Sequence, residues 1–327
     1  MPEFDLIRRL QDRIAAPLFE RESGCVVGIG DDGAVLEVQP GRQLVVCTDT
    51  LNEGVHFPRS TAARALGHKA LAVNLSDLAA MGAEPAWFFL NLALPDESTA
   101  WLDEFAAGMG DLASEAGILL AGGDTTTGPL SVTVTALGLV EPGRALLRSG
   151  AQAGDLVVVS GAPGRAACAL ERLEHGEEPG AAGRMALDYP RPRLALGRAL
   201  CGLATSCIDV SDGLLADLGH ILEQSGVGAE VSVDALPIDT ELAGFDDAHR
   251  WSLQLGGGDD YELCFTAPAG AETRLAALAG ELGLALTVIG RITAAGGLRV
   301  VQADGAPFIP ERAGYQHFAD RSKAGQP

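Results

Sequence analysis

Residues 66–95 read LGHKALAVNLSDLAAMGAEPAWFFLNLALP, and this stretch indicates the fold class. Its first part belongs to a helical pattern that we place from Thr61, a candidate N-cap, to Met81, with Gly82 as the stop. The apolar run from Ala86 to Ala93 then predicts a buried strand. A long helix that leads directly into a buried strand is typical of an α/β or α+β protein.

The same alternation of helical and β-rich segments continues outward in both directions. We expect further helices at 99–116, 212–224 and 272–282, and strands at 25–27, 34–38, 44–48, 118–121, 132–139, 156–160, 207–210, 261–266, 286–289 and 298–301. The sequence GGDTTTG, residues 122–128, is expected to be a loop between two strands. The turn-rich segment 142–155 predicts a domain boundary, with one domain at 1–148, a second at 149–318 and a frayed tail at 319–327.

The composition excludes several classes of protein. The 327 residues include 23 basic and 44 acidic side chains, a net charge of −21, and no segment supplies the basic face that nucleic acids require. No apolar run approaches the ~20 residues of a membrane span. The acidic N-terminus argues against a signal peptide, and the six cysteines form no CxxC pair. We therefore expect a cytoplasmic protein that binds neither nucleic acid nor membrane and has no zinc site or disulfide framework.

Two familiar nucleotide-binding motifs are absent or unconvincing. Neither Lys69 nor Lys323, the two lysines, lies in a P-loop. Residues 28–33, GIGDDG, match the dinucleotide pattern GxGxxG, but Asp31 and Asp32 would repel a pyrophosphate and a strand follows instead of a helix. We therefore interpret these aspartates as functional and the dinucleotide match as accidental.

Carboxylates flanked by glycine and hydroxyl residues recur at the ends of the predicted elements in both halves. Such oxygen ligands suit Mg²⁺, and several Mg²⁺ ions bridging a polyphosphate would support in-line phosphoryl transfer. These acids are Asp31, Asp32, Asp49, Asp77, Asp124, Asp209, Asp212, Asp259, Asp260 and Glu262.

Each acid also has a simpler interpretation as a helix cap or turn former. Asp212 is the weakest candidate, because an acid at a helix N-terminus is stabilising in any case. Asp77 is the strongest, because an acid near the end of an apolar helix opposes the helix dipole and needs another partner. His56 contacts a phosphate or is structural, and Arg148 clamps a phosphate or is a surface residue. Paired carboxylates also suit a glycosidase, but no single acid–base pair is singled out.

Seven blocks together resemble the thiamine-monophosphate kinase family, within the superfamily of aminoimidazole ribonucleotide synthetase and selenophosphate synthetase. In chain order they are GIGDDGAVL, CTDTLNEGVHF, LGHKALAVNLSDLAAMGAEP, AGGDTTTG, RSGAQAGD, DVSDGLLADLGHI and GGGDDYELCF. The resemblance implies a two-domain α/β (α+β) architecture with mixed sheets and helices packed on them. It also implies a homodimer formed through the N-terminal domain, with the active site between the domains.

The activity implied by the resemblance is ATP-dependent, Mg²⁺-assisted phosphorylation of thiamine monophosphate to thiamine diphosphate, with direct transfer and no covalent nucleophile. The positions that match the family's metal ligands are Asp32, Thr48, Asp49, Asp77, Asp124, Asp209 and Asp212. Those that match ATP contacts are Gly123, Asp124, Arg148 and Ser211. Those that match substrate contacts are His56, Glu262 and Phe318, with Tyr315 as the alternative to Phe318.

Glu262 is expected to meet the cationic thiazolium of the substrate. Two departures from the family pattern stand out: Cys47 replaces a common serine, and Asp259 replaces a glutamate. Two other functions stay open. One is a sister enzyme of the superfamily that phosphorylates a different acceptor, and the other is a nucleotide-binding regulator without chemistry.

Overall fold

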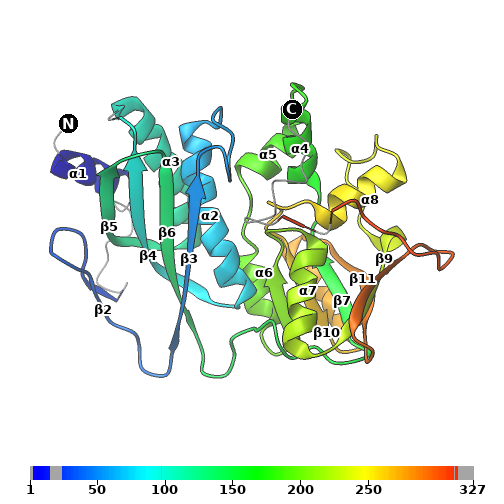
Figure 1. Ribbon diagram of the computed structural model, residues 1–327. Helices are drawn as coiled ribbons and strands as arrows, with labels where there is room; N and C mark the ends of the chain where they lie inside the picture. Colours follow the sequence, from blue (N-terminus) through cyan, green and yellow to red (C-terminus); the bar gives the residue numbers. More distant parts are fainter. Residues whose placement is uncertain (1–2, 15–23, 97, 313, 316–327) are drawn as a thin grey trace.

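A computed structural model describes residues 3–14, 24–96, 98–312 and 314–315 of the chain (Figure 1). Within them a four-stranded sheet and a six-stranded sheet lie side by side, and a two-stranded hairpin projects from the first. The elements of the first half are α1 (Glu3–Ile14), β1 (Cys25–Val27), β2 (Val35–Leu36), β3 (Gln43–Asn52), α2 (Ala63–Ala80), β4 (Glu84–Leu94), α3 (Thr99–Ala116), β5 (Leu119–Thr127) and β6 (Ser131–Val140). Those of the second half are β7 (Leu156–Ser160), α4 (Arg165–Glu174), α5 (Ala181–Asp188), α6 (Leu194–Leu200), β8 (Ser206–Asp209), α7 (Leu214–Ser225), β9 (Gly228–Ser232), η2 (Val233–Ala235), α8 (Asp247–Gly256), β10 (Leu263–Ala267), α9 (Glu272–Leu282), β11 (Leu286–Thr293) and β12 (Gly297–Val301).

The first sheet has the order β3-β6-β4-β5 and is mixed, because β4 and β5 run parallel while the other pairs are antiparallel. The expectation that residues 122–128 form a loop is wrong: β5 continues to Thr127. Its three threonines are good strand formers, and the neighbouring β4 supplies hydrogen-bond partners along this length. β3 likewise extends to Asn52, so Asp49 lies on a strand.

Helix α2 is enclosed by both halves of the molecule, and 14 of its 18 residues are buried. A helix that is buried nearly all round has apolar residues on every face, which explains why residues 66–80 are mostly apolar. The expected N-cap at Thr61 is wrong, because the helix begins at Ala63 and Ala62 occupies the cap without a side-chain bond. The expected stop is confirmed: Gly82 follows the helix with φ 67°.

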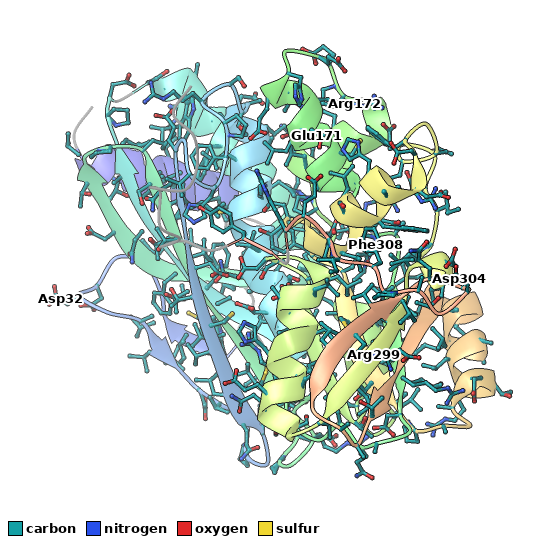
Figure 2. The ribbon with its side chains drawn as sticks, turned by 45° about the vertical axis from the view of Figure 1, so that its right-hand side comes forward. Asp32, Glu171, Arg172, Arg299, Asp304 and Phe308 are labelled. Atoms are coloured by element: carbon teal, nitrogen blue, oxygen red, sulfur yellow. The ribbon has the colours of Figure 1, made fainter. Side chains whose placement is uncertain are left out.

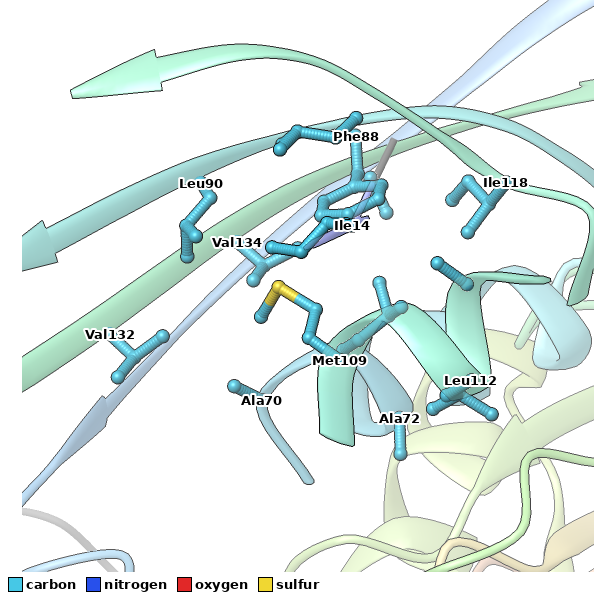
Figure 3. Close-up of a cluster of buried hydrophobic side chains, with 14 of the residues drawn as sticks. Ile14, Ala70, Ala72, Phe88, Leu90, Met109, Leu112, Ile118, Val132 and Val134 are labelled. Atoms are coloured by element: carbon cyan, nitrogen blue, oxygen red, sulfur yellow. The ribbon is translucent and has the colours of Figure 1, made fainter. Parts of the chain in front are cut away.

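Helices α2 and α3 cover one face of the first sheet and form its hydrophobic core (Figure 3). Met109 of α3 lies among Phe88, Leu90 and Val134 from the strands, all of them buried. The helices approach closely because glycine stands at their crossing, where a Cβ on Gly67 would lie 2.0 Å from a backbone oxygen of α3. The opposite face of the sheet carries exposed side chains on β3.

The second sheet has the order β12-β9-β11-β7-β10-β8 and is also mixed, with β9 and β12 parallel. Helices cover both of its faces: α7 and α8 on one, α6 and α9 on the other. All five residues of β7 are therefore buried, as in the apolar strands of doubly covered sheets. The expected architecture of mixed sheets with packed helices is confirmed. Helices α1, α4, α5, α6 and α8 and strand β9 were not expected.

Candidate active site

Three carboxylates from the two halves meet beside α2. Asp77 lies in the last turn of this helix, Asp49 on β3 and Asp209 at the end of β8. The backbone N–H of Asp49 donates to Oδ1 of the buried Asn74 at 3.1 Å, which fixes β3 against α2. Ser76 Oγ donates to Asp209 Oδ2 at 2.7 Å and connects α2 with the second half. Helix α2 therefore holds Asp49 of the first half and Asp209 of the second half close to its own acid, Asp77.

Burial raises the pKa of each of these acids, and the charges of neighbouring aspartates add to the rise. Burial, followed by the charges of Asp209 and Asp49, raises the pKa of Asp77 to about 8. Burial raises the pKa of Asp209 to about 6, although the Ser76 hydroxyl opposes the shift. Burial also raises the pKa of Asp49, against the effect of its hydrogen bond with Asp77. Negative charge on these acids is disfavoured because they are held close together and away from water, and a bound cation would relieve this cost.

A fourth acid, Asp217, shapes the loop that follows β8. Its Oδ2 accepts the backbone N–H groups of Ser211, Asp212 and Gly213 at 3.0, 3.1 and 3.2 Å. Burial and then the charge of Asp209 raise the pKa of Asp217 to about 7. The expectation that Asp212 opens the helix is wrong, because Gly213 has φ 126° and α7 begins at Leu214. Asp217 is the acid in the first turn of α7 and was not identified from the sequence.

The donor set of this cluster fits a hard divalent cation. Within the described residues no lysine or arginine forms an ion pair with Asp49, Asp77, Asp209 or Asp217. Over the same part of the chain, no three His, Cys, Asp or Glu side chains are placed to hold an ion by themselves. Mg²⁺ usually takes one or two carboxylates, several waters and substrate phosphates, so it does not need such a preformed cage.

Comparisons with known proteins bear on what such a cluster does. The family model for the AIR synthase related protein N-terminal domain matches residues 30–140, and the model for the C-terminal domain matches 152–302. The thiamine-monophosphate kinase of Escherichia coli strain K12 is 44% identical over 328 residues, covering 97% of this chain and 98% of the relative. The chain belongs to the thiamine-monophosphate kinase family.

Two solved structures of this family share the fold over nearly the full length. A thiamine-monophosphate kinase from Stenotrophomonas maltophilia K279a has a TM-score of 0.84 at 48% identity, covering 93% of this chain and 97% of its own. AaThiL complexed with AMPPCP and TMP has a TM-score of 0.75 at 32% identity, covering 97% of both chains. The resemblance to the family that the motifs indicated is confirmed.

The structure places other residues from the family resemblance around the cluster. Burial raises the pKa of Asp49 and of Asp209, and His56 opposes the first shift while Arg148 opposes the second, so both side chains act on the acids. Cys47 lies on the same side of β3 as Asp49, with Sγ 3.4 Å from Asn74 O. Among its neighbours are Asp77 and Asp49, and burial raises the pKa of its thiol strongly.

Several residues implied by the family resemblance lie apart from the cluster in the single chain. The hydroxyl of Thr48 bonds to Val134 O and Thr135 Oγ1, both at 3.1 Å, on the other side of β3. Gly123 and Asp124 lie on β5, the sheet edge opposite to β3. Asp32 is exposed on the projecting hairpin loop (Figure 2). Phe318 lies outside the described residues, and the backbone N–H of its alternative, Tyr315, donates to Asp212 O at 2.8 Å.

Glu262, which is expected to meet the cationic thiazolium, is already paired with an arginine of the chain itself. Only 5% of this residue is exposed, and Arg193 donates to both of its carboxylate oxygens, at 2.7 Å to Oε2 and 2.5 Å to Oε1. Ser160 Oγ donates to Oε2 as well, at 2.5 Å. A carboxylate neutralised in this way attracts a cationic ring weakly. Arg193 and Ser160 lie far from Glu262 in sequence and outside the quoted motifs, so nothing in the sequence pointed to them.

Proposed function

We propose that the protein phosphorylates thiamine monophosphate to thiamine diphosphate at the expense of ATP, as its family relatives are named for doing. The observation that carries the proposal is full-length identity of 44% with a named thiamine-monophosphate kinase, over a chain whose acids converge from both halves. The solved relative with AMPPCP and TMP supports the same pair of substrates.

We propose that the acids act by holding Mg²⁺. The candidate ligands are Asp49, Asp77 and Asp209, together with those implied by the family resemblance: Asp32, Thr48, Asp124 and Asp212. Bound Mg²⁺ would supply positive charge to the transferring phosphoryl group. The chain itself provides oxygen ligands and, in Arg148, a guanidinium beside Asp209 that suits a phosphate.

The remaining assignments draw on both halves of the chain for each substrate. We propose Gly123, Asp124, Arg148 and Ser211 for ATP. For thiamine monophosphate we propose His56, Phe318, and Glu262 as part of its pair with Arg193. The acceptor is a phosphate whose oxygen is already ionised, so the transfer needs neither a general base nor a covalent nucleophile. The protein therefore contributes by aligning the two substrates and by neutralising the charge of their phosphates.

An acceptor panel tests the function. We expect the purified protein with ATP and Mg²⁺ to release ADP when thiamine monophosphate is added, and phosphorus NMR to detect thiamine diphosphate. Release with another phosphorylated or carboxylated acceptor, and none with thiamine monophosphate, would identify a sister enzyme of the superfamily instead. ATP binding without transfer to any acceptor would identify a nucleotide-binding regulator.

We also propose a homodimer formed through the first sheet. The face of this sheet turned away from the helices exposes Leu44 and Val46 on β3, 43% and 56% accessible, and Val26 and Val35 of the hairpin are also exposed. Adjacent aliphatic side chains of this kind are typical of a surface covered by another chain. A second copy of the same sheet, related by a two-fold axis, would cover them and is the commonest arrangement in soluble oligomers.

A single charge on this face tests the dimer. Because Val46 is central to the exposed strand, Val46→Glu is expected to convert a dimer into a monomer in size-exclusion chromatography with light scattering. Val288→Glu is the matched control, since Val288 is an exposed valine of β11 in the other half, 38% accessible. A wild-type protein that elutes as a monomer at all concentrations would contradict the proposal.

For cellular location we propose the cytoplasm. None of the six cysteines forms a disulfide, and Cys168, Cys207 and Cys264 are buried thiols. Among the described residues no helix is both long and apolar enough to cross a membrane.

A further inference from the structure

We propose that Lys69 is a positioning residue that aligns the carboxylates of the two halves by pairing with Asp259; this inference rests on the proposed function. Lys69 lies on α2 in the first half, and Asp259 lies in the GGGDDYEL segment of the second. Their Nζ and Oδ2 atoms are 2.9 Å apart. Neither side chain touches the substrates in this assignment, so the effect on the reaction is exerted through other residues.

The burial of Lys69 excludes the usual role of a lysine in a kinase. Its side chain is only 3% exposed and its ammonium group already has a carboxylate partner. A buried charge of this kind is maintained only where it is paired, and it is not available to a nucleotide phosphate. The pair is thus a fixed connection between the halves.

The segment that Lys69 holds is strained. Asp259 and Tyr261 have φ of 65° and 51°, and they are the two described non-glycine residues with positive φ. The Asp259 carboxylate connects Lys69 with Tyr261. Its Oδ2 accepts a hydrogen bond from Lys69, and its Oδ1 accepts one from the Tyr261 hydroxyl at 2.8 Å. The Tyr261 side chain is 6% exposed and packs in the core of the first half. Removal of the lysine would therefore release a conformation that the backbone does not favour.

This segment is bonded directly to the loop that carries the second half's acids. Asp259 N donates to Ser211 O at 2.9 Å, and Tyr261 N donates to Val210 O at 2.8 Å. Leu263 pairs with Asp209 in the β-ladder. A shift of the segment would consequently move Asp209 relative to the acids of the first half.

Helix α2 makes a second contact of the same kind, which shows why one helix sets the alignment. Ser76, seven residues after Lys69, donates to Asp209. Residues separated by seven positions lie on one face of a helix, two turns apart. Lys69 and Ser76 thus bind the second half from one face of α2, and Ser76 is directly followed by Asp77, the acid that α2 itself contributes.

The test is a double-mutant cycle between Lys69→Met and Asp259→Asn in the full-length protein. We expect each single variant to lower kcat about 30-fold or more, while the KM for thiamine monophosphate and the Kd for AMPPCP change less than about fivefold. Misalignment of bound reactants affects turnover more than binding. The double variant is expected to lose no more than the worse single variant, because both remove one connection. The matched control is Arg299→Met, which breaks the exposed Arg299–Glu230 ion pair of the second half (Figure 2) and is expected to leave kcat unchanged.

Hydrogen exchange gives a readout independent of turnover. In both single variants, without substrates, the amides of Asp259 and Tyr261 are expected to exchange at least tenfold faster than in the wild type. Losses of kcat that multiply in the double variant, or unchanged exchange in a folded variant, overturn the proposal. If Lys69→Met does not fold, Asp259→Asn alone decides it by the same two measurements. A wild type that is inactive with thiamine monophosphate refutes the proposed function, and exchange then decides the role of Lys69.

Discussion

Asp77→Asn is expected to lower kcat at least about 10³-fold, equivalent to ~4 kcal/mol of transition-state stabilisation, with the fold intact. The carboxylate lies between Asp49 and Asp209, and the amide that replaces it has one oxygen and no charge for Mg²⁺. Circular dichroism and turnover at saturating Mg²⁺ check the result. Asp304→Asn is the control: Asp304 lies in an exposed turn of the second half (Figure 2) and is not a member of the cluster, so this variant is expected to retain full activity. Near-normal turnover of Asp77→Asn would contradict the metal role.

The same substitution has a pH signature in the metal-free protein. The pKa of Asp77 is about 8 in the folded protein against an ordinary value of 3.8, so between these values the folded chain binds a proton that the unfolded chain has lost. The free energy of unfolding should therefore fall as pH rises from about 4 to about 8, by at most ~1.4 kcal/mol per pH unit. Denaturant titrations with EDTA are expected to show a shallower fall in Asp77→Asn, and Mg²⁺ should reduce the slope in the wild type.

Gly123→Ala is expected to destabilise the protein by at least about 3 kcal/mol and to weaken AMPPCP binding more than tenfold. Gly123 has φ 147°, and a Cβ there would lie 1.8 Å from the carbonyl oxygen of Leu90 on β4. The overlap would separate β4 from β5 where β5 carries Asp124. Thermal denaturation and calorimetric titration measure the two effects.

Gly128→Ala is the matched control at the end of the same segment. A Cβ at Gly128 meets only the Cβ of Ala93, at 3.6 Å, which is an ordinary contact. We expect a change in the free energy of unfolding within about 0.5 kcal/mol and unaltered binding of AMPPCP. Equal effects of the two substitutions would show that the close approach at Gly123 has no special role.

Much of the fold was predictable because local patterns and tertiary packing agree. The helices at 99–116 and 272–282 and the strand at 156–160 have the expected bounds. The start of β5 was predicted at 118–121, but its continuation to Thr127 was not predictable, because pairing with β4 overrides the turn character of GGDTTTG. Helices α4, α5, α6 and α8 were missed because they are short, with 7 to 10 residues each. The boundary after residue 148 stays a prediction.

The candidate site was predictable in its acids and unpredictable in their partners. Asp49, Asp77 and Asp209 stand out in motifs, and the structure brings them together. Lys69 and Arg193 do not stand out in the sequence, because the carboxylate that each one binds is far away in the chain: 190 residues for Lys69 and 69 residues for Arg193. Spacing reveals residues on one element, whereas an ion pair between segments that are distant in the chain leaves no periodic pattern. The roles assigned to the site residues stay predictions.

Tyr261 belongs to the second half, but its ring packs in the hydrophobic core of the first half. A fragment ending near residue 148 would have a vacancy in its interior, and a fragment beginning there would expose an aromatic ring to water. Each half is therefore expected to be less stable alone than in the intact chain. A cut in the 142–155 segment is therefore expected to cost both pieces stability, and mixing the two pieces is expected to restore part of it by returning the ring to its place.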